Sequence, residues 1–247
     1  TRTSDLRNQG LLRVAGRLDA TELALAAGQL ELADGRVFVT GDASAQQGAR
    51  LSGAGRIDFD LPTRALSLSH GAELAPGGAG IGTISIGAEL RAHLSHLAFE
   101  IARGAGGPSS DRVEVSGRGQ LFSNAQFHVS ALPGSAFERG DEFDLLVASQ
   151  VDLSGTPVED FFVAPPELGA SLSIAPFLRD SGTTQSLAVR LIRTTTATWS
   201  DAEGRFDAPE WSFDAAPAAA LFPNNDYLDV FDVRIQAAVL VDDDDGR

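Results

Sequence analysis

Apolar residues alternate with polar or small residues in short runs along most of this chain, and no other feature of the sequence restricts the fold as strongly. Residues 30–32 (LEL) and 84–86 (ISI) are two of these runs. A period of two places every second side chain on one face, as in a strand that buries one side. Turn-forming residues, such as 34–35 (DG) and 53–55 (GAG), separate the runs. The sequence therefore predicts an all-β fold made of many short strands.

The spacing of these strands favours a parallel β-helix, or β-solenoid, over a sandwich. The pattern glycine, polar, aliphatic, any, aliphatic occurs at residues 28–32 and again at 82–86. Aromatic residues make up only 7% of the chain, which suits thin stacked layers filled by small and aliphatic side chains. A two-sheet jelly roll is the alternative that the same alternation allows. We expect the solenoid over residues 1–193, with broader coils or a sandwich-like cap from about Leu97 onward.

Residues 194–247 are expected to form a separate, aromatic and aspartate-rich C-terminal segment. It holds both tryptophans and the only tyrosine of the chain. An aromatic cluster at a chain end usually plugs a core or forms an interface, so we expect a cap or a strand that joins subunits. A glycan-binding platform is the alternative, because aromatic rings can stack on sugar rings. The candidate subunit-interface or ligand residues are Trp199, Trp211, Phe222, Tyr227 and Phe231.

The charge of the chain narrows the classes of partner. The net charge is −15 at pH 7, and an acidic surface repels phosphate backbones and anionic lipids. Nucleic-acid binding is therefore not expected. Membrane insertion is not expected either, because no apolar run approaches the ~20 residues of a spanning helix.

The chain contains no cysteine, so we expect no disulfide. It also contains no methionine, so we expect a chain that begins after processing or is an excerpt of a longer polypeptide.

Histidines and glycine-rich loops give no pattern that predicts a metal or phosphate site. His93 and His96 lie three residues apart, which in a strand places them on opposite faces and disfavours a shared metal ion. The other two histidines, His70 and His128, are distant in sequence. Residues 104–107 (GAGG) are not followed by the lysine and helix of a phosphate-binding loop. We predict no metal site.

Paired carboxylates are the strongest candidates for catalytic residues, because β-helix enzymes that cleave polysaccharides use aspartates on one face. Asp58 and Asp60 have the spacing to share a strand face, and Glu159 and Asp160 lie in a loop-like stretch. Without a basic partner or an aromatic platform nearby in sequence, we interpret both pairs as solvated, so the chain is not expected to be an enzyme. No cofactor is expected; weak calcium binding by residues 242–245 (DDDD) is the alternative to a flexible acidic terminus.

Three motifs, in order along the chain, resemble those of autotransporter-type, passenger-associated repeat proteins of bacterial surfaces. They are residues 75–86 (APGGAGIGTISI), 110–117 (SDRVEVSG) and 137–146 (FERGDEFDLL). The resemblance implies a right-handed parallel β-helix, exported to the cell surface or secreted by a bacterium. It also implies that no residue is catalytic, since the repeats of this family carry no catalytic residues as a class.

The C-terminal part resembles a segment that opens a new block of coils in the same proteins. The matching residues are 199–202 (WSDA), 223–226 (PNND) and 231–235 (FDVRI), while residues 215–221 replace a stretch that is usually glycine-rich. A block-opening segment at the end of the chain predicts that copies stack head to tail, with residues 230–241 continuing the fold of the next copy. The expected function is thus an extracellular structural module that forms a fibre, sheath or surface layer with itself as partner. An adhesin or glycan-binding module is the alternative, and a polysaccharide-processing enzyme is a third.

Overall fold

The computed structural model describes residues 2–8, 10–78, 80–163, 172–199, 211–213, 216–220 and 229–235, and within these it contains strands and one turn of 3-10 helix, η1 (Val158–Phe161). The all-β prediction is therefore confirmed for the described residues. The strands of the first half are β1 (Arg2–Asn8), β2 (Leu11–Val14), β3 (Arg17–Ala26), β4 (Gln29–Val39), β5 (Ala43–Gln46), β6 (Arg50–Phe59), β7 (Ala65–Leu68), β8 (Glu73–Pro76), β9 (Thr83–Ile86) and β10 (Glu89–Ala92). Those of the second half are β11 (His96–Gly104), β12 (Gly107–Ser110), β13 (Arg112–Leu121), β14 (Gln126–Ala131), β15 (Glu142–Asp152), β16 (Leu172–Asp180), β17 (Gln185–Trp199), β18 (Trp211–Phe213), β19 (Ala216–Ala220) and β20 (Asp229–Ile235).

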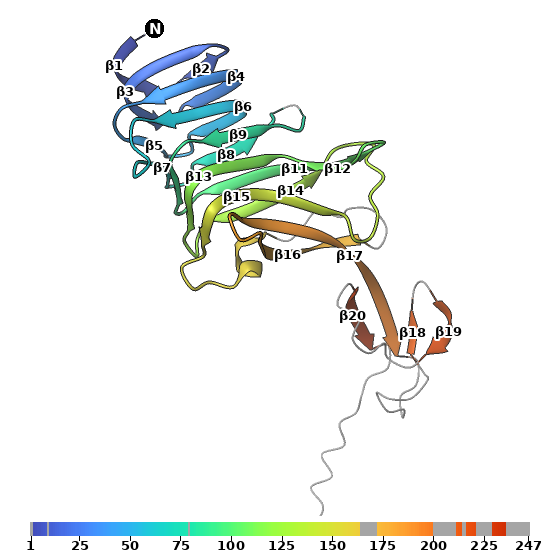
Figure 1. Ribbon diagram of the computed structural model, residues 1–247. Helices are drawn as coiled ribbons and strands as arrows, with labels where there is room; N and C mark the ends of the chain where they lie inside the picture. The colour runs from blue at the N-terminus through green and yellow to red at the C-terminus, as the bar shows by residue number, and fades with distance from the viewer. Residues whose placement is uncertain are drawn as a thin grey trace, which may run out of the picture.

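Parallel ladders stack the inward side chains of successive strands on one another. Leu30 of β4 pairs with Leu51 of β6, Leu51 with Leu74 of β8, and Leu74 with Leu97 of β11. Leu97 pairs in turn with Phe127 of β14. All five side chains are fully buried, and burial of each contributes about 1.5–3 kcal/mol. Figure 1 shows the strands side by side in successive layers from the N-terminal end, in blue, to β15.

The pairings of eight strands close a ring. Going round it, β3 pairs with β4, β4 with β6, β6 with β9, β9 with β13, β13 with β10, β10 with β7, β7 with β5 and β5 with β3, always in parallel. The predicted right-handed β-helix, or solenoid, is therefore wrong, and the structure is a closed eight-stranded parallel barrel with additional strands. The jelly-roll alternative is also wrong, because its strands would be antiparallel.

Ring closure depends on long strands whose two halves pair with different neighbours. In β6 the first half pairs with β8 and the second half with β9. In β13 the first half pairs with β9 and the second with β10. Each such strand belongs to two ladders at once, so the ladders join instead of remaining separate faces.

Two positions predicted as turns lie inside these long strands. Asp34-Gly35 is part of β4, and residues 53–55 are part of β6. Asp34 has a φ of 57° and Gly53 a φ of 92°, so the strand bends at a left-handed residue without ending. The prediction of uniformly short strands ended by glycine turns is wrong at these corners, because the glycines there allow a bend and a close approach.

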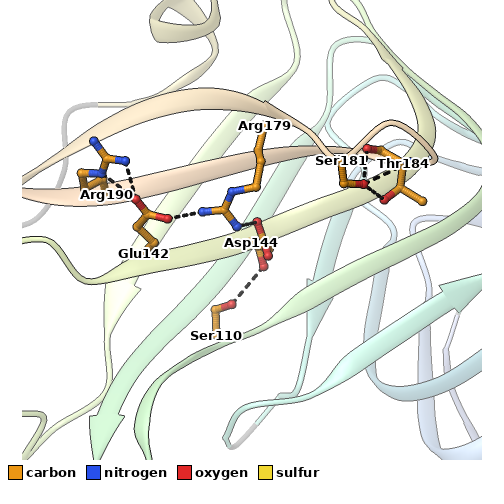
Figure 2. Close-up of polar contacts among 7 residues, drawn as sticks. All are labelled: Ser110, Glu142, Asp144, Arg179, Ser181, Thr184 and Arg190. Carbon is orange, nitrogen blue, oxygen red and sulfur yellow. Dashed lines mark hydrogen bonds and ion pairs between the residues drawn. The ribbon is translucent and has the colours of Figure 1, made fainter.

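An antiparallel sheet of β15, β17 and β16 follows the parallel strands. An ion network connects its three strands, as Figure 2 shows. Arg190 of β17 donates from Nε to Glu142 of β15 at 2.7 Å, and Glu142 also contacts Arg179 of β16. Arg179 donates to Asp144 at 2.9 Å, and the Ser110 hydroxyl donates to the Asp144 carbonyl oxygen at 3.0 Å. Both carboxylates thus have guanidinium partners, and the network connects the sheet to the end of β12.

Strand β17 continues past this sheet, where it pairs in parallel with β20 and in antiparallel with β18. The expected domain boundary between residues 193 and 194 falls inside β17. Of the expected joining strand, residues 230–241, the structure describes the part up to Ile235, which belongs to β20 and pairs with its own chain.

Candidate functional site

Strands β6, β8, β11 and β14, of which β6 belongs to the barrel, present a row of polar side chains on the side that faces away from the core. In β11 the residues Leu97, Phe99 and Ile101 point into the core, so the alternate residues His96 and Glu100 lie on the outer side and are partly exposed. The parallel register aligns their neighbours with them, layer upon layer. We call this row the polar face; it consists of Arg50, Glu73, His96, Glu100, His128 and Ser130.

A cleft of about 190 Å³ lies at one end of the polar face. Glu100, Asp111 and Arg50 are the charged residues that line it. The cleft therefore brings together two acidic residues and one arginine that lie far apart in the sequence. Its lining residues are Arg50, Ala75, Pro76, Gly78, Ala98, Phe99, Glu100, Asp111 and Ser130.

Asp111 connects two parts of the chain through its carboxylate. It is only 1% exposed, and its two oxygens accept hydrogen bonds from the backbone N–H groups of Gly82 and Glu100, each at 2.8 Å. A Cβ on Gly77 would lie 2.4 Å from Asp111 Oδ1, so the loop before β9 packs directly on the carboxylate. Burial raises the pKa of Asp111 to about 6, outweighing the two backbone hydrogen bonds that lower it; the nearby charge of Glu100 raises it further.

Asp111 in this cleft is better suited to holding the fold than to accepting a proton from a substrate. A general acid or base needs an oxygen that can reach a substrate proton. Both Asp111 oxygens are already occupied by backbone N–H groups. Glu100 has one carboxylate oxygen, Oε2, that is buried and has no hydrogen-bond partner among the described residues. We therefore interpret Asp111 as a latch between the loop before β9 and strand β11.

Replacement of Asp111 by asparagine is expected to reduce the pH dependence of stability between pH 4 and pH 6. The pKa of Asp111 is 3.8 when unperturbed and about 6 when folded, so the folded state holds the proton more tightly. Its contribution to stability is complete below the unperturbed pKa and is lost, by about 1–3 kcal/mol, as the pH rises through the folded value. Urea unfolding of Asp111→Asn across this range should give a flatter profile than that of the unmodified chain.

The exposed carboxyl of Glu159 provides the control for this measurement. Glu159→Gln removes a carboxyl group that lies on η1 and should leave the pH profile unchanged. If Asp111→Asn showed the same slope as Glu159→Gln, the latch would not titrate in this range.

The carboxylates singled out from the sequence do not form paired sites. Asp58 is buried between Arg36 and Arg56, with Arg56 Nε 2.6 Å from its Oδ1. Asp60 contacts Arg64 instead, at 3.4 Å. Asp58 is thus an ion-paired structural residue and not the solvated group that we expected, because the parallel register brings an arginine from the neighbouring layer to it. Glu159 and Asp160 lie on η1 and are exposed, as the sequence suggested.

The four histidines make three polar contacts, and in one of them His70 Nδ1 lies 3.1 Å from the Ser69 hydroxyl oxygen. His93 is exposed and contacts Asn124 at 3.3 Å. His96 and His128 contact each other, with 3.2 Å between His96 Nδ1 and His128 Nε2. Burial lowers the pKa of His128, as does the neighbouring His96, while Glu73 opposes the shift. The pair was missed at the level of sequence because its members are 32 residues apart and only the parallel register of β11 and β14 brings them together.

For three of the five aromatic candidate residues, the structure gives the backbone partner in a β-ladder. Trp199 and Trp211 are direct partners in the ladder between β17 and β18, and Phe231 of β20 is the partner of Thr195. Phe222 and Tyr227 lie outside the described residues, as do the aspartates at 242–245. Glu100, Asp111, His96 and His128 are therefore the residues that the structure adds to this set.

The described residues contain no cluster of three or more side chains suited to hold a metal ion, and no helix among them has the length and apolarity to cross a membrane. The likeness to autotransporter-type repeat proteins stays a prediction from short motifs. Comparison of the chain with family models and with curated proteins gives no match.

Proposed function

We propose that this chain is a structural module of an extracellular bacterial assembly, and that copies associate end to end through strands with open edges. The ordered motifs of residues 75–146 support the extracellular setting. The open edges of the additional strands β1, β2 and β20 support the association, and they are the observation on which the proposal depends.

One end of the molecule has two strands with an unpaired edge. Among the described residues, β1 pairs with β3 alone and β2 with β4 alone. Gln29 of β4 donates its N–H to the Gly10 carbonyl oxygen, and bonding groups alternate along a parallel strand. Leu11 and Arg13 therefore turn their backbone N–H and carbonyl groups away from β4, toward the open edge. The Leu11 side chain is 66% exposed at this edge.

The other end offers a second edge. Strand β20 pairs in parallel with β17 and, within the described part of the chain, with no other strand. Unpaired N–H and carbonyl groups readily accept another strand. A contact between two different edges of the same molecule does not close on itself and produces a filament. We therefore propose a second copy of this chain as the partner of the β1–β2 edge.

Sedimentation velocity over a range of concentrations tests this proposal. The unmodified chain should show a sedimentation coefficient that rises with concentration. Leu11→Lys should weaken the association about tenfold or more, because it removes the burial of one leucine and places a charge beside the edge.

Leu61→Lys is the matched control, since Leu61 is 48% exposed but lies in the turn after β6, away from the edge. It should associate like the unmodified chain. A chain that remains monomeric at every concentration, or two variants that behave alike, would contradict the proposal.

An adhesin or glycan-binding role remains the second proposal. Its candidate residues Trp199 and Trp211 are backbone partners in one ladder, which would gather the two tryptophans at one place on the chain. A glycan that changes the tryptophan fluorescence would favour this role over self-association.

A further inference from the structure

We propose that His96 and His128 form a two-histidine binding site for a divalent transition-metal ion of the zinc, nickel and copper class. The proposal is independent of the self-association described above. It rests on the positions of two side chains in neighbouring strands, on the distance between their nitrogen atoms and on the charges around them.

The fold fixes both histidines on the same side of one ladder. His128 of β14 is the backbone partner of Ala98, which follows His96 by two residues in β11. The two histidines are therefore diagonal neighbours on the polar face. The residues flanking them, Leu97 and Phe127, point inward and are fully buried. This packing of the flanking residues holds the backbone under both imidazole rings.

The distance between the two nitrogens matches that of two ligands on one ion. His96 Nδ1 and His128 Nε2 are 3.2 Å apart, and the ring centroids are 5.3 Å apart. Two imidazole nitrogens bound to zinc at about 2.0–2.1 Å, in tetrahedral geometry, lie about 3.3 Å from each other. Each ring has to turn slightly so that its lone pair meets the ion. The proton that one nitrogen donates in the free pair then moves to the other nitrogen of the same ring, by exchange with solvent, so that both ligands are neutral imidazoles.

The charges around the pair do not oppose a cation. Glu73 of β8 is the backbone partner of His96, and its negative charge acts on His128. Arg50, the cation next in this row, contacts Glu73 at 3.4 Å, so the opposite charges of Arg50 and Glu73 offset each other. The chain as a whole carries a net charge of −15. The protein supplies only two ligands, so water molecules occupy the remaining coordination positions, which face the solvent.

Imidazole nitrogens also determine the class of ion. Zinc, nickel and copper bind imidazole well, whereas magnesium and calcium prefer oxygen ligands. The acidic surface of the chain can attract any divalent cation weakly, and this attraction does not distinguish among them. A site made by His96 and His128 distinguishes zinc, nickel and copper from magnesium and calcium.

Calorimetric titration of the full chain with Zn²⁺, Ni²⁺ and Mg²⁺ tests the proposal. We expect one site for Zn²⁺ and Ni²⁺, and no comparable site for Mg²⁺. His96→Gln and His128→Gln should each weaken binding about tenfold or more, since loss of even a group that supports a ligand costs that much. His93→Gln should bind like the unmodified chain, because His93 contacts Asn124 and not the pair.

Copper EPR on the unmodified chain identifies the ligand atoms directly, without relying on the folding of any variant. Coupling of Cu²⁺ to two imidazole nitrogens is the expected result. Coordination by oxygen alone, equal binding by the double variant His96→Gln/His128→Gln, or equal loss of binding in His93→Gln would each overturn the proposal.

Discussion

Gly53→Ala is expected to lower the free energy of unfolding by more than about 4 kcal/mol, enough to leave the chain unfolded or insoluble. Gly53 has a φ of 92°, in the left-handed region that side chains with a Cβ rarely adopt. A Cβ at this position would lie 2.1 Å from the Leu32 carbonyl oxygen of β4. The contact is with backbone, so it is relieved only if β6 moves away from β4 where their ladder bends. Solubility and thermal unfolding measure the effect.

Two glycines with different surroundings separate the clash from the strain. Gly134 has a φ of 82° with open space around it, so Gly134→Ala carries the conformational strain alone, about 1–2 kcal/mol. Gly16 has neither a positive φ nor a neighbour within 4 Å, and Gly16→Ala should change stability by less than about 1 kcal/mol. If Gly53→Ala unfolded at the same temperature as Gly134→Ala, the close approach of β4 and β6 would have no energetic importance.

The alternating pattern was sufficient to predict the inward residues of the runs that it singled out. Leu30 and Leu32 point inward and Glu31 outward, as the period of two requires, and Ile84 and Ile86 behave in the same way. Local sequence carries this information because burial of one face is a local property of a strand.

The closure of the barrel could not be predicted in this way. Glycine at position 53 is compatible both with a turn that ends a strand and with a bend inside a strand pressed against its neighbour. The choice depends on whether Leu32 of another strand lies opposite, which is a contact between residues distant in sequence. Residues 34–35 are equally compatible with a turn and with a bend, so the sequence predicted shorter strands, and more separate ladders, than the structure has.

The residues of the cleft could not be identified from the sequence, for a related reason. Glu100 could be placed on the outside of its strand from the alternation alone. Burial of Asp111 depends on the backbone of Gly82, which is 29 residues earlier, and a buried aspartate cannot be told from an exposed one by its sequence neighbours. The sequence instead pointed to carboxylates that are close together along the chain, such as Asp58 and Asp60, each of which pairs with different arginines.

Arg103→Ala is expected to lower the free energy of unfolding by about 3 kcal/mol, because it leaves a buried carboxylate without its counter-charge. Arg103 of β11 contacts Asp141 through Nη1 and Glu138 through Nη2, the latter at 2.8 Å. Asp141 is only 7% exposed. Its backbone also bonds to β17, since Leu191 donates its N–H to the Asp141 carbonyl oxygen at 2.8 Å. The substitution therefore weakens the connection between the parallel strands and the antiparallel sheet.

Comparison with an exposed ion pair and a second substitution shows whether the buried charge is the cause. Arg91→Ala removes the exposed pair with Glu89, 2.8 Å apart, and should cost less than about 1 kcal/mol. In the background of Arg103→Ala, Asp141→Asn removes the unpaired charge and should restore part of the lost stability, as a double-mutant cycle in urea would measure. Equal losses for Arg103→Ala and Arg91→Ala, or a double variant less stable than Arg103→Ala, would mean that Asp141 is solvated well enough to dispense with its partner.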